Sequence, residues 1–180
     1  MDPVRPEEEW VDLIDRDNRV IGRTSRREVR QKNLLHRGVG IICLNSGGEV
    51  YVHRRTDTKD VFPGLHDMFV GGVVSSGETY ETSARREVAE ELGIVGPEPV
   101  YLFRHLYEGP RNASWIQVYS VTWDGPIVHQ PEEVAWGRWL PLDQLDDWID
   151  EHEIVPDGLE VYREYRAHVQ GSRSAEPPLP

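Results

Sequence analysis

The sequence has little cysteine and little positive charge, and it has no long apolar run. Its single cysteine, Cys43, cannot form a disulfide within the chain. No apolar run approaches the length of a membrane span, and the acidic residues 1–10 lack the apolar core of a signal peptide. Lys and Arg number 20 against 32 Asp and Glu, a net charge of -12. These absences predict a cytoplasmic protein that binds neither a membrane nor a nucleic-acid polymer, because affinity for phosphate polymers rests on surplus Lys and Arg.

A length of 180 residues suits one domain with small additions. We expect an N-terminal extension over residues 1–33, a main domain over 34–169 and a flexible tail over 170–180. Ser25 and Glu28 form a Ser-x-x-Glu capping box, which predicts a short helix within the extension. The tail is rich in Pro and Ser and has little to bury, which is typical of a disordered segment.

Short apolar runs bounded by turn residues predict strands, and a few helical patterns lie between them. The expected strands are two within Trp10–Thr24, then Arg37–Leu44, Glu49–Arg54, Asp67–Val74, Val100–Tyr107, Ser114–Trp123 and Trp136–Leu140. The expected helices are Arg26 to about Gln31, Thr79–Leu92, Leu142–Glu151 and Pro156 to about Val169. Strands interleaved with a few helices predict a layered α/β fold.

The segment 72–94 carries the strongest chemical signal, because three glutamates gather in its predicted helix. Glu87, Glu90 and Glu91 stand at i, i+3 and i+4, which puts their carboxylates on one face within a single turn. Like charges so placed repel each other unless a hard cation lies among them. Oxygen-only ligands suit Mg²⁺ or Mn²⁺, so this face predicts a divalent metal site.

The same segment resembles the Nudix signature G-x5-E-x7-R-E-U-x-E-E-x-G-U, in which U is a bulky aliphatic residue. Every fixed position is filled, and a chance match is on the order of 10⁻⁹ per start position at ordinary residue frequencies. The matching residues are Gly72, Glu78, Arg86, Glu87, Val88, Glu90, Glu91, Gly93 and Ile94. The alternative interpretation, a solvated acidic helix face, does not need Arg86, Glu78 and the glycines at these offsets.

The resemblance implies an α/β/α sandwich with a mixed, curved sheet and a hydrolase that cleaves diphosphate linkages with Mg²⁺. Glu87, Glu90 and Glu91 are then the expected metal ligands, with Glu87 and Glu91 the foremost catalytic candidates. The turn before the helix can add a backbone carbonyl from Gly71 or Gly72, where the missing side chain permits close approach. Arg86, paired with Glu78 or with Glu87, would fix the orientation of the carboxylates.

The general base is expected outside this segment. Glu133 lies in PEEVAWGRWLPLDQL, which resembles the Glu-Val then Trp-Leu-Pro pattern that follows the last core strands in the family. Glu108 and Glu132 are competing candidates, and a solvated loop glutamate is the alternative interpretation for each.

Residues before the signature resemble the isopentenyl-diphosphate isomerase branch of the superfamily. Arg55 and Lys59 match basic positions that bind the diphosphate there, although solubilising loop charges are an equal alternative. The isomerases depend on a cysteine and a metal-binding histidine after the Phe62-Pro63-Gly64 turn. Those two places hold Gly71 and Val73 here, so the resemblance does not extend to isomerase chemistry.

The sequence therefore predicts a Mg²⁺-dependent Nudix hydrolase that acts on a small nucleotide-like or other organic diphosphate. Two alternatives remain at this point: an isomerase, and a catalytically silent module that binds a nucleotide. The family often dimerises, so a homodimer is also open. The sequence does not identify the substrate.

Overall fold

The fold is built around β3 (His36–Leu44), which pairs in parallel with β8 (Ala113–Thr122) along its whole length. The computed structural model describes residues 9–174. The other strands of the nine-stranded mixed sheet are β1 (Trp10–Ile14), β2 (Val20–Ser25), β4 (Glu49–Arg55), β5 (His66–Asp67), β6 (Phe69–Val70), β7 (Val100–Glu108) and β9 (Val134–Pro141). β4 pairs with β3 only at Leu44–Val50 and runs antiparallel to β9 along its whole length, so the two consecutive strands diverge after their turn.

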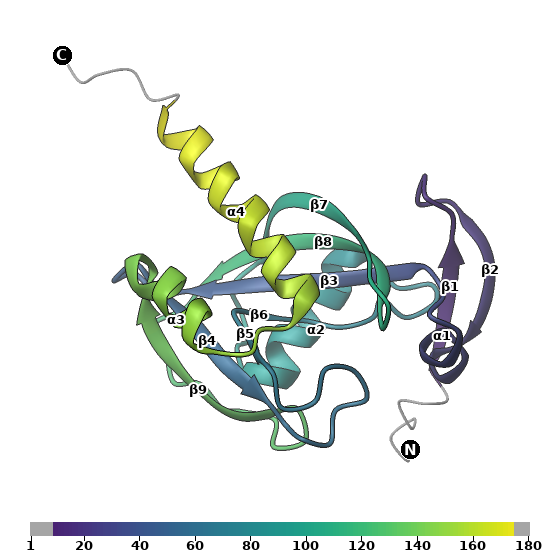
Figure 1. Ribbon diagram of the computed structural model, residues 1–180, viewed down its shortest axis with the longest axis horizontal. Helices are drawn as coiled ribbons and strands as arrows, with labels where there is room; N and C mark the ends of the chain where they lie inside the picture. Colours follow the sequence, from purple (N-terminus) through teal and green to yellow (C-terminus); the bar gives the residue numbers. More distant parts are fainter. Residues whose placement is uncertain (1–8, 175–180) are drawn as a thin grey trace.

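Both faces of β3 are buried, and its side chains alternate between two apolar cores. Ile41 and Cys43 belong to a core that includes Ala84, Val88 and Leu92 of α2 (Tyr80–Leu92). On the opposite face, Ile42 joins a core that contains residues of α3 (Leu145–Glu151) and α4 (Pro156–Ser174), among them Leu145, Trp148, Val161 and Tyr165. In Figure 1, α4 crosses in front of the sheet and α2 lies behind it. The predicted α/β/α sandwich with a mixed sheet is confirmed.

The first elements form a hairpin, β1–β2, followed by α1 (Arg26–Lys32), at one end of the sheet (Figure 1). The predicted cap of α1 is present, since the Ser25 side chain accepts a hydrogen bond from Glu28 N. Leu13 pairs with His36, so this piece continues the main sheet.

Two expected boundaries were wrong. The strand expected over Asp67–Val74 is broken after Asp67, because its Oδ1 accepts hydrogen bonds from Met68 N (2.8 Å) and Phe69 N (3.1 Å). Helix α4 continues to Ser174 instead of ending at about Val169, so the start of the expected flexible tail is helical. A lone glycine, Gly171, costs a helix only about 1 kcal/mol, whereas the first helix-breaking proline comes at 177. Residues 175–180 lie outside the described part.

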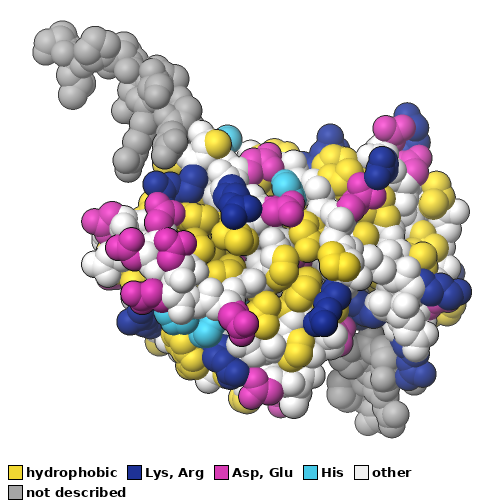
Figure 2. All heavy atoms as spheres, in the orientation of Figure 1, with side chains coloured by type: hydrophobic (Ala, Val, Ile, Leu, Met, Phe, Trp, Pro, Cys, Tyr) yellow, Lys and Arg dark blue, Asp and Glu magenta, His cyan; other side chains and the backbone are white. Residues whose placement is uncertain are grey.

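Acidic surface residues gather at one end of the molecule. Figure 2 shows them over α3, whose sequence LDDWIDE carries four acids, at the end away from α1 in Figure 1. None of the helices within residues 9–174 is long and apolar enough to cross a membrane.

Candidate active site and adjoining cavities

Helix α2 holds the three glutamates at the border between core and solvent. It begins after Thr79, whose side chain accepts a hydrogen bond from Thr82 N, and it ends at Gly93 in the left-handed conformation. Its apolar strip packs on the sheet, which carries Glu87 and Glu91 down into buried positions. The side chain of Glu90 is 51% exposed. The helix therefore presents two buried carboxylates and one at the rim.

Gly72 lies directly against the Glu87 carboxylate. A Cβ at Gly72 would be 2.4 Å from Oε1 of Glu87, and a Cβ at Gly71 would be 2.0 Å from the Val39 carbonyl oxygen. Gly71 thus requires glycine, because the obstacle is backbone, whereas a side chain at Gly72 would have to displace the Glu87 carboxylate. The Gly72 carbonyl accepts a hydrogen bond from Val39 N (2.9 Å) and keeps a second lone pair.

Arg86 joins the carboxylates that the sequence predicted as its alternative partners. Its Nε and Nη2 donate to the two oxygens of Glu78, each at 3.1 Å. Its Nη1 lies 2.7 Å from Glu87 Oε1 and 3.2 Å from Glu90 Oε2. Burial alone would raise the pKa of Glu78, but hydrogen bonds from Arg86 and Ser83 outweigh it and the pKa is lowered. Glu78 therefore stays ionised and anchors the guanidinium.

Glu87 and Glu91 are buried carboxyl groups with raised pKa values. Burial raises the pKa of Glu87 despite its ion pair with Arg86. Burial and the charge of Glu87 raise the pKa of Glu91 to about 7, although Lys59 and Arg55 oppose the rise. Within residues 9–174, no three His, Cys, Asp or Glu side chains converge as a ready metal site, and the Arg86 guanidinium binds both Glu87 and Glu90. The oxygen-only donors fit Mg²⁺ or Mn²⁺, and a divalent cation would relieve the repulsion between Glu87 and Glu91.

The basic residues expected to bind the diphosphate, Arg55 and Lys59, lie near enough to Glu91 for their charges to oppose the rise of its pKa. Lys59, with a side chain only 9% exposed, forms an ion pair with Glu133. Burial and the charge of Arg55 lower the pKa of Lys59 to about 8. Arg55 donates to the Val61 carbonyl (2.9 Å) and the Phe62 carbonyl (3.2 Å), which fixes the loop after β4.

The three candidate bases have different surroundings. Glu133 is held by Lys59, and its backbone carbonyl accepts a hydrogen bond from Thr56 N (3.1 Å). Glu132 is exposed, and its carbonyl accepts from the Thr56 hydroxyl (2.8 Å). Glu108 pairs with Arg16 of the β1–β2 turn (2.8 Å). Of the three, Glu133 is the one in contact with Lys59.

A cavity of about 460 Å³ lies between α1 and the loops before β5 and β9. Lys59 and Glu133 line it together with three arginines of α1: Arg26, Arg27 and Arg30. Arg26 and Arg30 both approach Asp60, at 3.7 Å and 3.4 Å. Our sequence interpretation missed these arginines. The signal available for them was the basic run SRREVR in a predicted helix.

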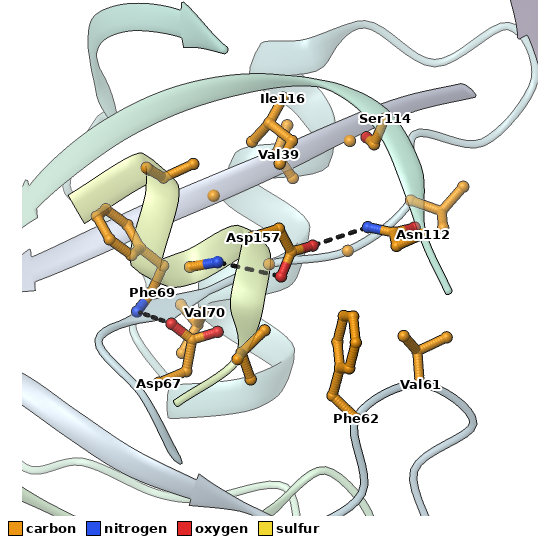
Figure 3. Close-up of a pocket in the computed structure, with 18 of the residues that line it drawn as sticks. Val39, Val61, Phe62, Asp67, Phe69, Val70, Asn112, Ser114, Ile116 and Asp157 are labelled. Atoms are coloured by element: carbon orange, nitrogen blue, oxygen red, sulfur yellow. Dashed lines mark hydrogen bonds between the residues drawn. The ribbon is translucent and has the colours of Figure 1, made fainter. Parts of the chain in front are cut away.

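A second cavity, of about 110 Å³, lies between the sheet and the start of α4 (Figure 3). Gly71 and Val73, the positions where an isomerase would need cysteine and histidine, line it, and neither side chain can donate a proton or bind a metal. Four of its polar residues come from different elements or loops and were not predicted: Asp67, Asn112, Ser114 and Asp157.

Comparison with known proteins gives consistent matches. Residues 34–165 match the NUDIX domain family. The chain is 45% identical over 162 residues to the uncharacterized Nudix hydrolase SCO1686 of Streptomyces coelicolor, covering 89% of this chain and 90% of that protein. It is 37% identical over 153 residues to the uncharacterized Nudix hydrolase YfcD of Escherichia coli K12, covering 85% and 84%. The crystal structure of DR0079 from Deinococcus radiodurans superposes with a TM-score of 0.74 at 29% identity, covering 87% and 98%.

Proposed function

This chain belongs to the Nudix family of pyrophosphohydrolases, and on that premise we propose that it cleaves a small organic diphosphate with Mg²⁺ held by Glu87 and Glu91. The observation that carries the proposal is the contact of Gly72 with the Glu87 carboxylate beside buried Glu91. This contact sets the backbone of Gly72 beside one of two buried carboxyl groups whose pKa values are raised. Glu90 at the rim is the third ligand, and Mn²⁺ is an alternative metal.

When bound, Mg²⁺ would offset the charge of the diphosphate and polarise its P–O bonds. The chain's own contribution is orientation. Glu78, fixed by Ser83 and Arg86, holds the guanidinium against Glu87 and so sets the direction of its carboxylate. Hydrolysis forms a bond from a water oxygen to one phosphorus and breaks the bond from that phosphorus to the bridging oxygen, which leaves with the second phosphate.

The water gives up a proton in this step, and we assign Glu133 to accept it. Glu133 is paired with Lys59 in the structure. The phosphates of a substrate would compete for Lys59, and Arg55 would bind beside it. Release of Lys59 would free the Glu133 carboxylate, so that binding of the substrate prepares it to accept the proton.

The two alternatives predict different products. An isomerase would convert isopentenyl diphosphate to an allylic isomer without releasing phosphate, and a silent module would bind a nucleotide without turnover. Gly71 and Val73 weigh against the first, and the retained acidic cluster weighs against the second.

The experiment is a screen for released phosphate over nucleoside di- and triphosphates, nucleotide sugars, dinucleotides and isoprenyl diphosphates, with Mg²⁺ and with a chelator. Glu87→Gln and Glu91→Gln should each lower kcat by about 100-fold or more, because loss of the negative charge of a metal ligand weakens metal binding and slows hydrolysis. The matched control is Glu81→Gln, on the exposed side of the same helix. Wild-type activity in both Gln variants, or activity that survives chelation, would overturn the proposal.

A further inference from the structure

The 110 Å³ cavity lies on the face of the sheet opposite α2 (Figure 3). Phe62, Phe69 and Ile116 contribute apolar walls, whereas Asp67 and Asp157 place carboxyl groups in it. An engineered apolar cavity of about 150 Å³ holds a benzene molecule, so this one can enclose at most about six non-hydrogen atoms of a group that enters it. The acids also distinguish it from an ordinary packing defect, which is apolar.

The two carboxyl groups are fixed in place. Asp67 accepts hydrogen bonds from two backbone amides, and Asp157 Oδ2 accepts one from Asn112 (2.7 Å). Arg30 Nη1 in turn donates to Asn112 Oδ1 (2.8 Å). A Cβ at Gly158 would lie 2.5 Å from Asp67 Oδ1, so the missing side chain lets α4 close on Asp67. The arrangement is a built polar wall joined to α1 by a chain of hydrogen bonds.

Burial and the charge of Asp157 raise the pKa of Asp67 to about 8. Burial raises the pKa of Asp157, against the hydrogen bond from Asn112. At neutral pH the Asp67 carboxyl is therefore mostly protonated and can donate a hydrogen bond, while Asp157 can accept one. The wall offers both roles to a ligand.

Ser114 supplies an independent sign of a ligand. Its side chain is 2% exposed, and its Oγ has no hydrogen-bond partner within the described part of the chain. The hydroxyl lies over Gly38, where a Cβ would be 2.6 Å from Oγ, and both residues line the cavity. Buried hydroxyls in native proteins are normally paired, so this one is available to a group that enters.

The cavity adjoins the hydrolase site. Gly72 lines the cavity and also touches the Glu87 carboxylate. Arg55, which lowers the pKa of Glu91, lines it as well. A diphosphate bound beside Arg55 would therefore lie within reach of this cavity, with the backbone of Gly72 between the cavity and Glu87.

We propose that this cavity selects the organic group of the substrate and that Asp67, Ser114 and Asp157 require it to be a small group bearing hydroxyls. The inference rests on the proposed hydrolase function. An apolar group would leave the Ser114 hydroxyl unpaired and would offer no partner to the free lone pairs of Asp67 and Asp157, which is how sites built for hydrogen bonds reject such analogues. A cationic group would meet Arg30 and Arg55, which already line the cavity.

The test compares two diphosphate monoesters with five-carbon groups, ribose 5-diphosphate and isopentenyl diphosphate, with Mg²⁺. We expect kcat/KM to favour the hydroxyl-bearing probe by at least about 100-fold. Ser114→Ala and Asp157→Asn should each reduce that preference by about tenfold or more, mainly through KM for ribose 5-diphosphate. Ser120→Ala, in the same strand but outside the cavity lining, is the matched control. A preference for the isopentenyl probe, or one unchanged in both variants, would overturn the inference.

A second measurement does not require turnover. Amide resonances of Gly38, Ser114 and Gly158 should shift on titration of isotope-labelled protein with ribose 5-diphosphate, and should shift less in Ser114→Ala. Shifts of these amide resonances without phosphate release from any substrate would support the cavity as a binding site and contradict the hydrolase function. Phosphate release without shifts at these amides would support the hydrolase function and contradict the cavity as the binding site of the organic group.

Discussion

At the scale of single residues, Gly72 lies against the carboxylate of the proposed metal ligand Glu87. All three atoms nearest to an added Cβ belong to the Glu87 carboxylate, at 2.4 to 2.8 Å. Gly72→Ala must therefore displace either the loop or the carboxylate. We expect kcat/KM to fall by about 100-fold, since a shift of 1 Å at a reacting centre can cost that much.

The control for this substitution is Gly22→Ala in β2, where the nearest atom is 3.8 Å from the new Cβ. Steady-state kinetics and thermal unfolding of both variants give the comparison. Wild-type kcat/KM in Gly72→Ala would show that the loop yields without moving Glu87.

His53 sets a dependence of stability on pH. Its side chain is 1% exposed, and burial followed by the charge of Arg55 lowers its pKa to about 3. A lowered pKa means that the stabilisation is complete above the ordinary value of 6.5 and is lost as the pH falls towards 3. Between pH 7 and pH 5 this group should cost about 2 kcal/mol of unfolding free energy.

Urea unfolding at pH 7 and pH 5 tests this for the wild type and for His53→Gln. The variant should lose about 2 kcal/mol less than the wild type over this interval. Comparison of the two proteins cancels the other titrating groups, such as Asp67, whose raised pKa acts in the opposite direction. Equal losses in both proteins would contradict the assignment.

At the scale of elements, helix α2 depends on its first turn. The Thr79 side chain accepts a hydrogen bond from Thr82 N (3.2 Å), which satisfies one of the free amides there. Thr79→Ala should lower the free energy of unfolding by about 1 kcal/mol. Because Glu87 and Glu91 lie beyond the first turn, kcat should stay within about twofold of the wild type.

Urea unfolding and kinetics measure the two effects separately. Thr122→Ala, at an exposed strand end, serves as the control. A large loss of kcat without a loss of stability would mean that Thr79 has a role in the site beyond capping.

At the scale of the whole molecule, the N-terminal helix α1 contributes to the cavity beside Lys59. Arg26 of α1 lines the 460 Å³ cavity with Lys59 and approaches Asp60. Arg26→Ala removes one positive charge from this cavity and should weaken substrate binding. We therefore expect KM to rise about tenfold with little change in kcat. Steady-state kinetics with the best substrate of the screen measures both constants.

Arg85→Ala is the control, since Arg85 forms an exposed ion pair with Glu98 on the outer side of α2. Equal effects of the two substitutions would indicate general electrostatics instead of a specific contact. Residues on both sides of the division proposed at residue 33 line the 460 Å³ cavity.

Much of the fold could be predicted from the sequence, because its signals are local. Ser25 with Glu28, and Thr79 with Gly93, mark the ends of helices through contacts within a few residues. The spacing of Glu87 and Glu91 follows from helical geometry alone. The break after Asp67 was missed. It arises because the Asp67 side chain accepts hydrogen bonds from the backbone amides of the next two residues, where the sequence predicted a continuous strand.

The sequence by itself determined the acidic helix face, the glycines before it and the family to which they belong. Only the tertiary structure decided that Lys59 meets Glu133 and that Asp67, Ser114 and Asp157 share a cavity with Gly72. The physical reason is range. Helix periodicity and capping act over a few residues. These contacts join residues that are tens of positions apart, and they form only when the strands, the loops and α4 pack together.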